Sequence, residues 1–238
     1  MVRLYHSNAN LSMGVYGLYE MWYNYLGGLD MVETETQQQI FEFSGKNMSL
    51  DFCNTIHDRT SSSPRELLTS YDSLLLWGQE GHILSEEEAK LLEEEARHHK
   101  EEAAATLKQA IELREAIYRL FDATSQGTSP AESDLETFNS ALSHAMTYSC
   151  IVAGPHGFEW GWQPEKRNLD RPLWAVVRAA ADLLTSEQLE DVRVCASDTC
   201  GWLFLDTSKN HTRRWCDMKS CGNRAKARKH YNQKKRAS

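Results

Sequence analysis

The sequence lacks the signatures of several large protein classes. Its 238 residues contain no run that approaches the roughly 18 uninterrupted apolar residues of a membrane-spanning helix. It also lacks a P-loop, a Gly-x-Ser-x-Gly elbow, a His-Glu-x-x-His pair and a Gly-x-Gly-x-x-Gly turn. The first absence excludes a helical membrane protein. The second absence does not exclude an enzyme, but it leaves catalysis without positive support. We expect that the protein is not an enzyme.

Cysteine is sparse, and its arrangement differs from that of a secreted disulfide scaffold. Four of the six cysteines form two C-x4-C pairs, Cys195 with Cys200 and Cys216 with Cys221, separated by residues 201–215. Zinc prefers four tetrahedral ligands, and two close thiolate pairs joined by a hairpin-sized segment can wrap one ion without a large core. The spacing therefore predicts a structural Zn²⁺ site in a cytoplasmic protein.

Acidic residues are scarce only at the C-terminal end of the chain. The formal net charge is -8, but from Arg193 onward twelve Lys and Arg residues accompany three Asp and Glu residues, a balance of +9. The preceding 192 residues hold 14 basic and 31 acidic side chains, a balance of -17. This division predicts a basic arm that binds a polyanion, attached to an acidic body that would repel one.

Residues 1–30 differ from the remainder of the chain. They are rich in Tyr, Gly and Asn, show neither helical nor strand periodicity, and lack the charge pattern of a signal peptide. Gly27-Gly28 can be encoded as GGAGG, a ribosome-binding sequence, so we interpret the segment as a non-native translated leader before a natural start at Met31. A disordered N-terminal extension is the alternative. We expect a body over 31–190 and a finger over 191–238.

The body is predicted to be α+β and mainly α. Helix caps, proline positions and a 3.6-residue apolar period indicate helices, whereas alternation of apolar and polar residues indicates strands. In chain order we expect a short N-terminal strand over 39–47, helices over 64–79, 85–122 with a break near 98–101, and 129–145, a β-hairpin over 147–163 and a helix over 170–184. The short connection over 185–192 predicts that the finger packs on this body.

Polar side chains interrupt and follow an apolar run near residue 50. Asn54, Thr55 and Arg59 lie close together in the sequence, and Arg114 lies on the core-facing side of a later helix. These four residues are candidates for a pocket in which arginine clamps an anionic effector. The alternative is that they cap a helix terminus and form internal hydrogen bonds.

The cysteine-rich end predicts a small treble-clef-like fold. Gly222 allows a tight turn directly after Cys221, so the last metal ligand would stand at the start of a helix. The expected elements are strands over 192–195 and 202–206, a turn over 207–210, a returning partner strand over 211–215 and a helix over 223–236.

The expected C-terminal helix is polar on every side, so it buries little surface and needs a partner. Lys and Arg supply phosphate contacts, guanidinium groups can read guanine edges, and tyrosine can stack or pack on sugar. RNA binding and a frayed, solvated terminus are the alternatives to DNA binding. The expected DNA-contacting residues are Arg213, Arg214, Arg224, Lys226, Arg228, Lys229, Tyr231 and Lys235.

These motifs resemble a known pair of domains. Residues 213–226, RRWCDMKSCGNRAK, together with the segments around Cys195 and 203–208, are similar to the CGNR zinc finger family. The body resembles that family's usual N-terminal partner, the ABATE domain, through LDFCNT at 50–55, Arg59, and RAAADLL at 178–184. The likeness covers roughly residues 39–230, so residues 1–30 have no counterpart in it.

The resemblance implies a stress-responsive bacterial transcription regulator. In such a protein the finger binds DNA, and the body senses a stress-related ligand. A rival function from another class is a zinc-dependent adaptor that docks RNA or an acidic protein partner. Specific DNA binding would differ from it by steep weakening with salt and by discrimination among duplexes.

Overall fold

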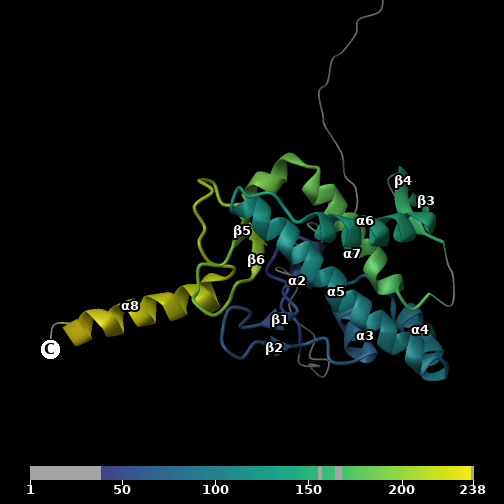
Figure 1. Ribbon diagram of the computed structural model, residues 1–238, viewed down its shortest axis with the longest axis horizontal. Coiled ribbons are helices and arrows are strands. Elements are labelled where there is room, and N and C mark those ends of the chain that lie inside the picture. Colours follow the sequence, from purple (N-terminus) through teal and green to yellow (C-terminus); the bar gives the residue numbers. More distant parts are fainter. Residues whose placement is uncertain (1–38, 155–156, 164–167, 237–238) are drawn as a thin grey trace, which may run out of the picture.

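The computed structural model describes residues 39–154, 157–163 and 168–236 (Figure 1). The predictions for residues 1–30 lie outside this part of the chain. The mainly helical α+β class is confirmed, and the described residues form three small two-stranded antiparallel sheets, β1-β2, β3-β4 and β5-β6. The elements are α2 (Met48–Cys53), β1 (Ile56–His57), β2 (Arg65–Glu66), α3 (Tyr71–Glu80), α4 (Glu86–His98), α5 (Lys100–Ser125), α6 (Glu132–Thr147), β3 (Ser149–Gly154), β4 (Gly157–Trp162), α7 (Arg171–Leu184), the 3-10 turn η1 (Glu187–Asp191), β5 (Val192–Val194), β6 (Leu203–Leu205), the π-helical turn η2 (Met218–Gly222) and α8 (Asn223–Arg236).

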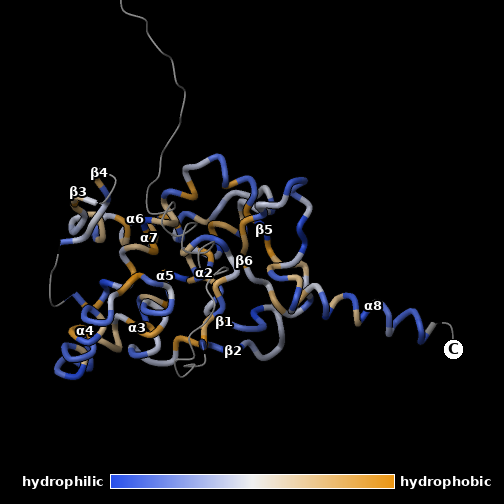
Figure 2. The backbone as a smooth tube through the Cα atoms, turned by 180° about the vertical axis from the view of Figure 1, so that it is seen from behind, coloured by the Kyte–Doolittle hydropathy of each residue, from blue (hydrophilic) through white to orange (hydrophobic). Residues whose placement is uncertain are grey.

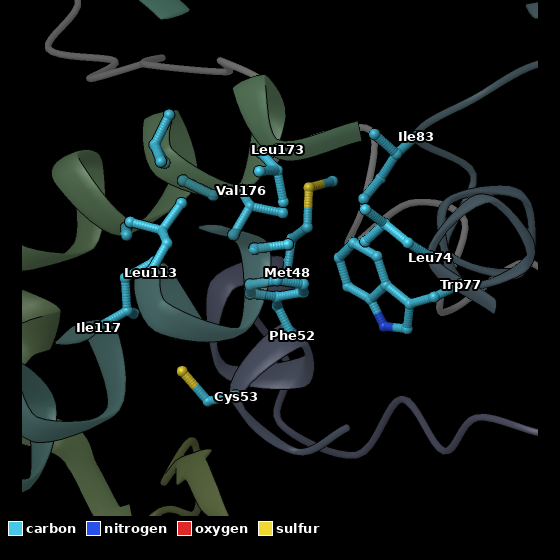
Figure 3. Packing of buried hydrophobic residues seen from close by; sticks show 14 of the residues in the cluster. Met48, Phe52, Cys53, Leu74, Trp77, Ile83, Leu113, Ile117, Leu173 and Val176 are labelled. Carbon is cyan, nitrogen blue, oxygen red and sulfur yellow. The ribbon is translucent and has the colours of Figure 1, made fainter. Parts of the chain in front are cut away.

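The core of the body is built around the short helix α2, whose six residues are all buried. Figure 3 shows Phe52 of α2 among Trp77 of α3, Leu113 of α5 and Val176 of α7. The ring centroids of Phe52 and Trp77 lie 4.9 Å apart with the rings tilted, an arrangement that aromatic pairs favour. The longer helices α3, α5 and α7 thus surround α2 and hold its C-terminal end in place.

Residues 39–47 do not form the predicted strand; they run as an irregular segment. Two of their backbone N–H groups bind a side chain instead of a second strand. The N–H groups of Ile40 and Phe41 donate to the two carboxylate oxygens of Glu80 at 3.1 and 3.0 Å. The carboxylate of Glu80 therefore satisfies two N–H groups that a strand would donate to its partner strand. The alternation of residue types in the sequence could not reveal this contact.

The helix predicted over 64–79 begins later than expected. Residues 65–66 first form β2, in which Glu66 lies opposite Ile56 of β1. Helix α3 follows Ser70, whose hydroxyl accepts a hydrogen bond from Ser73 N at 3.2 Å while the Ser73 hydroxyl accepts one from Ser70 N at 3.1 Å. This reciprocal capping box satisfies two terminal N–H groups, so it is a stronger start than Pro64 alone.

Several other body predictions are confirmed. Ser85 and Glu88 form the capping box that begins α4, and the long helical segment breaks at His99, between α4 and α5. The β3-β4 hairpin pairs Ser149 with Trp162 through Gly154 with Gly157, and α7 lies where the helix over 170–184 was expected.

Helix α6 begins at Glu132, three residues after the predicted start, and it has no side-chain cap. Instead Asp134, in its first turn, is bound by Arg119 of α5 through contacts of 2.6 to 3.0 Å. The start of α6 is therefore positioned by an ion pair with the neighbouring helix rather than by a serine cap.

Strand β6 is buried on both sides and joins the body to the cysteine cluster. Leu203 and Leu205 belong to the body core, whereas Phe204, with Trp202 just before the strand, packs with the four cysteines. Successive side chains of a strand point to opposite faces, so this short strand is shared by two cores.

The returning strand predicted over 211–215 does not form in the described chain, and β5 takes its place beside β6. Asp206 accepts a hydrogen bond from Arg213 N at 2.8 Å, which closes the intervening residues into a loop. The carbonyl of Arg214 then accepts one from Ala196 N at 2.9 Å. Residues 211–215 therefore hydrogen-bond to Asp206 and to the loop that follows Cys195. These bonds stand in place of the predicted strand pairing.

The side chain of Asn54, directly after α2, fastens β6 to the body. Its Nδ2 donates to the carbonyl of Leu203 and its Oδ1 accepts from the N–H of the same residue, both at 2.9 Å. Nearby, Leu205 N donates to Gly45 O at 2.9 Å. These buried bonds confirm that the finger packs on the body, since both main-chain polar groups of Leu203 depend on one amide.

Replacing Asn54 by Ala should lower the free energy of unfolding by about 2–5 kcal/mol, because it leaves two buried backbone groups of Leu203 without partners. Urea denaturation measures the loss. Asn139→Ala, an exposed change inside α6, is the matched control and should not destabilise the chain. Equal stability of the two variants would contradict this role of Asn54.

Candidate metal centre and nucleic-acid interface

The four predicted cysteine ligands converge on one point. Their Sγ atoms all lie within 4.8 Å of one another, and all four residues are buried. The separations of Cys200 from Cys216 and of Cys216 from Cys221 are 3.6 and 3.7 Å. Four sulfurs at about 2.3 Å from a tetrahedral zinc would stand about 3.8 Å apart, so the cluster fits a Zn²⁺ ion.

Local structure explains how each pair of ligands is presented. Cys195 directly follows β5, and its N–H donates to the carbonyl of Trp202 at 2.7 Å. Gly201 adopts a φ of +64° after the second ligand, and an added Cβ there would stand 2.7 Å from Thr60 of the body. Glycine thus allows both the turn and the close approach of the body.

The second pair stands at the entrance to the C-terminal helix. Asp217 accepts a hydrogen bond from Ser220 N at 2.7 Å and so caps the helical turn η2. Cys221 lies in this turn, immediately before α8. A metal bound by Cys221 would therefore hold the first turn of α8, and with it the direction of the whole helix.

Three of the thiols, those of Cys195, Cys200 and Cys216, influence one another's ionisation. Hydrogen bonds from Cys200 and Cys216 lower the pKa of Cys195, whereas the bond to Cys195 raises the pKa of Cys200 and of Cys216. A Zn²⁺ ion held by these cysteines would favour the thiolate form of its ligands. Arg224 supplies further positive charge, since its Nη2 donates to Cys221 Sγ at 3.2 Å.

Helix α8 carries most of the predicted DNA-contacting residues and projects away from the body (Figure 1). Figure 2 shows that it is hydrophilic along most of its length. Arg224, Arg228, Tyr231 and Lys235 recur at helical spacing on one face, and all four are exposed, as is Lys226. The Lys229 side chain lies outside the described part of the structure. The helix contains no acidic residue, so it offers a continuous cationic surface.

The two remaining predicted contacts, on the loop before Cys216, differ from each other. Arg214 is exposed, with its guanidinium 5.3 Å from the ring of Trp215. Arg213 is half-buried, donates to the carbonyls of Trp215 and Cys216, and lies 4.7 Å over the ring of Phe204. Arg213 thus supports the metal loop, whereas Arg214 is open to solvent.

Two acidic residues that sequence reasoning missed lie against α8. Asp198, between the first two cysteines, forms an ion pair with Arg228, and Asp58 of the body lies 4.0 Å from Arg224. A groove of about 420 Å³ separates α8 from the 196–198 loop. Nothing in the sequence marks these carboxylates, because the contact depends on the direction in which α8 leaves the cluster.

The predicted ligand residues form a buried polar network beside the metal centre. Arg59 donates to Glu115 at 2.6 and 3.2 Å and stacks 3.9 Å over the ring of Tyr118. Arg114 is almost fully buried and makes two 2.7 Å hydrogen bonds to Glu66, with a third bond of 2.9 Å to Glu115. Each guanidinium is therefore neutralised by carboxylates of the protein itself.

The other two members are also paired internally. Thr55 accepts a hydrogen bond from Arg114 at 3.1 Å and donates to Phe52 O at 2.8 Å, and Asn54 holds Leu203. The structure thus brings all four residues together in the arrangement of internal hydrogen bonds that was the alternative interpretation. That they bind an effector stays a prediction.

A separate groove of about 620 Å³ lies between α5, α6 and α7. Its described lining includes Thr106, Leu113, His144, Asp170 and Trp174, and it contains none of the four residues of the polar network. His144 Nε2 lies 2.9 Å from Asp170 Oδ2, which also accepts from Trp174 Nε1 at 3.0 Å. Sequence reasoning did not find this groove, because it depends on how three helices pack.

The ABATE family, described as a putative stress-induced transcription regulator, matches residues 46–187, more than half of the chain. The chain belongs to the ABATE family. The CGNR zinc finger matches residues 192–234, directly after the ABATE region and over the cysteine cluster and α8. No curated protein matches the chain.

Both expected resemblances are confirmed, in the expected order. The ABATE region holds the helical body and the buried polar network, and the CGNR region holds all four cysteines. These are regulator and zinc-finger families rather than enzyme families. Within the described residues, no helix has both the length and the apolar character needed to cross a bilayer.

Glu115 gives the network a defined pH dependence. Burial by itself raises the pKa of Glu115, but the hydrogen bonds and charges of Arg59 and Arg114 outweigh burial and hold the pKa below its ordinary value. The stabilisation is therefore present at neutral pH and is lost as pH falls through this lowered pKa.

Glu115→Gln should cost about 1–3 kcal/mol of unfolding free energy at pH 7, and the difference from the parent should shrink as the pH falls below about 4. Urea titrations at several pH values measure it. Glu112→Gln, exposed on the same helix, is the control and should change little at any pH. A cost for Glu115→Gln that stays constant with pH would contradict the ionic role of this carboxylate.

The metal centre predicts one equivalent of zinc per chain. Cys216→Ser should lose that zinc and, because β6 is shared with the body core, should also lower the melting temperature of the whole chain. Elemental analysis and circular dichroism measure both quantities. Cys150→Ser, on the β3-β4 hairpin, should keep both unchanged. Full zinc occupancy in Cys216→Ser would show that this cysteine is not a ligand.

Proposed function

We propose that this ABATE protein is a transcription regulator that binds duplex DNA through α8, with a structural Zn²⁺ held by Cys195, Cys200, Cys216 and Cys221. The observation that carries the proposal is the position of Cys221 in the turn that opens α8. Metal binding there gives an exposed basic helix a fixed direction, which a frayed terminus would lack.

The charges on α8 support a nucleic acid partner. Exposed Arg and Lys side chains neutralise phosphates, and release of the counterions held by those phosphates supplies much of the binding free energy. Tyr231 is exposed on the same face as Arg224 and Arg228, where it can pack against sugar or base. The acidic body would repel DNA, so binding is confined to the finger.

The ABATE body supplies the second part of the proposal, the sensing of a stress-related ligand. Its support is the family description and the groove between α5, α6 and α7. Helix α5 lines that groove with its first half and contacts the finger with its second half, where Tyr118 donates to Gly201 O at 2.9 Å. A ligand that shifts α5 would therefore move a contact of the metal centre.

Arg228→Ala and Lys235→Ala should each weaken binding to duplex DNA about threefold to tenfold near 0.1 M salt. Each lost phosphate contact should also reduce the slope of log affinity against log salt by about 0.9. Fluorescence anisotropy with a labelled duplex measures both quantities.

Arg97→Ala, an exposed change on α4 of the acidic body, is the matched control and should leave affinity and slope unchanged. A weak salt dependence that neither variant alters would contradict DNA binding by α8. Tighter binding to an RNA of the same length would instead favour the adaptor function.

A further inference from the structure

Four of the nine large exposed hydrophobic side chains of the described residues lie on the β3-β4 hairpin. Among the described residues, the exposed fractions are 56% for Ile151, 42% for Val152, 85% for Phe158 and 42% for Trp160. A typical monomer scatters such residues singly, and a contiguous group of them marks an interaction site. The hairpin projects beside α6 and α7 at one end of the molecule (Figure 1).

The strand register sorts these residues into two faces. Ile151 lies opposite Trp160, and Ala153 lies opposite Phe158. Residues that are paired across an antiparallel ladder share a face, so these four form one apolar surface. Val152 points to the other face, opposite Glu159.

The base of this apolar surface is anchored on α7, but its outer part is not. The ring centroids of Trp162 and Trp174 lie 5.7 Å apart, and the guanidinium of Arg178 lies 4.1 Å from the ring of Trp160. Beyond them, Ile151 and Phe158 remain exposed. An isolated two-stranded hairpin is marginally stable in water, so a protruding hairpin with an apolar face gains stability when that face is covered.

Charge indicates what covers it. The residues of β3 and β4 include one charged side chain, Glu159, and it lies on the opposite face. The first 192 residues carry a net charge of -17, so two copies of the body repel each other where carboxylates dominate. A second acidic body can therefore approach this face of the hairpin without meeting a carboxylate of β3 or β4. We propose that Ile151, Ala153, Phe158 and Trp160 pack against the same residues of a second copy of this chain, about a twofold axis.

The exposed area sets the expected strength of this dimer. From the 150–250 Å² that a large aromatic side chain can bury, the exposed parts of Ile151, Phe158 and Trp160 amount to roughly 400 Å² per copy. Two copies would cover roughly 800 Å² with these side chains, and flanking backbone adds to this. The total is near the lower limit for a specific interface, so the dimer should be reversible and micromolar. It would carry two α8 helices, as a protein that binds two half-sites requires.

Sedimentation velocity of the zinc-loaded full chain, from about 1 to 100 µM, tests the proposal. The parent protein should shift from a 27.2 kDa monomer to a dimer across this range. Ile151→Thr with Phe158→Ser should remain monomeric at every concentration. Leu91→Ser, which removes an equally exposed hydrophobic side chain from α4, should dimerise as the parent does. A parent that stays monomeric, or a double variant that dimerises like it, would overturn the proposal.

Cross-linking gives a second measurement that does not depend on the fold of the double variant. In a Cys150→Ser background, Ala153→Cys lies on the proposed surface and should form an intermolecular disulfide faster than Glu136→Cys, which is exposed on α6. Equal rates at the two positions would likewise contradict a dimer through this face.

Discussion

The side-chain amide of Asn54 holds both main-chain polar groups of Leu203, and the position of the metal centre depends on this pair. Leu203 and Leu205 are buried in the body core, and Phe204, between them, is buried against the cysteines. A change on one side of β6 must therefore be felt on the other, because a close-packed strand cannot shift toward one core without leaving space in the second. The finger is in this sense an extension of the helical body.

The same arrangement explains how an acidic protein can present a basic surface. The acidic body would repel a polyanion. Helix α8 projects away from the body, in a direction set by Cys221 and the turn η2. Its first turns lie near carboxylates, where Asp58 and Asp198 approach Arg224 and Arg228. Under the proposed function, phosphates replace these carboxylates, and exposed pairs of this kind cost little to separate.

Local signals in the sequence predicted much of the architecture. The capping box at Ser85, the β3-β4 hairpin and the convergence of four cysteines each depend on residues close together in the chain, or on a ligand chemistry that requires them to meet. Two of the predictions that were wrong depend on long-range partners. Residues 39–47 do not form a strand, and two of their N–H groups bind Glu80 of α3. Strand β6 pairs with β5, because residues 211–215 form their hydrogen bonds elsewhere.

The candidate site shows the same division. The spacing of the cysteines and the basic helix after them could be recognised without a structure. By contrast, two of the ion pairs could not, because Glu115 meets Arg59 and Glu66 meets Arg114 only in the folded body. Adjacency of Glu115 to Arg114 was the one available signal, and it does not show that the carboxylate bridges two arginines.

Hydrogen exchange before and after zinc removal tests most directly whether β6 couples the metal centre to the body. The amides of Leu203 and Leu205 and those of α2, which packs against β6, should be protected in the zinc-bound protein and should exchange faster once the metal is removed, together with residues 206–222. Faster exchange confined to residues 206–222, with β6 and α2 still protected, would contradict the account.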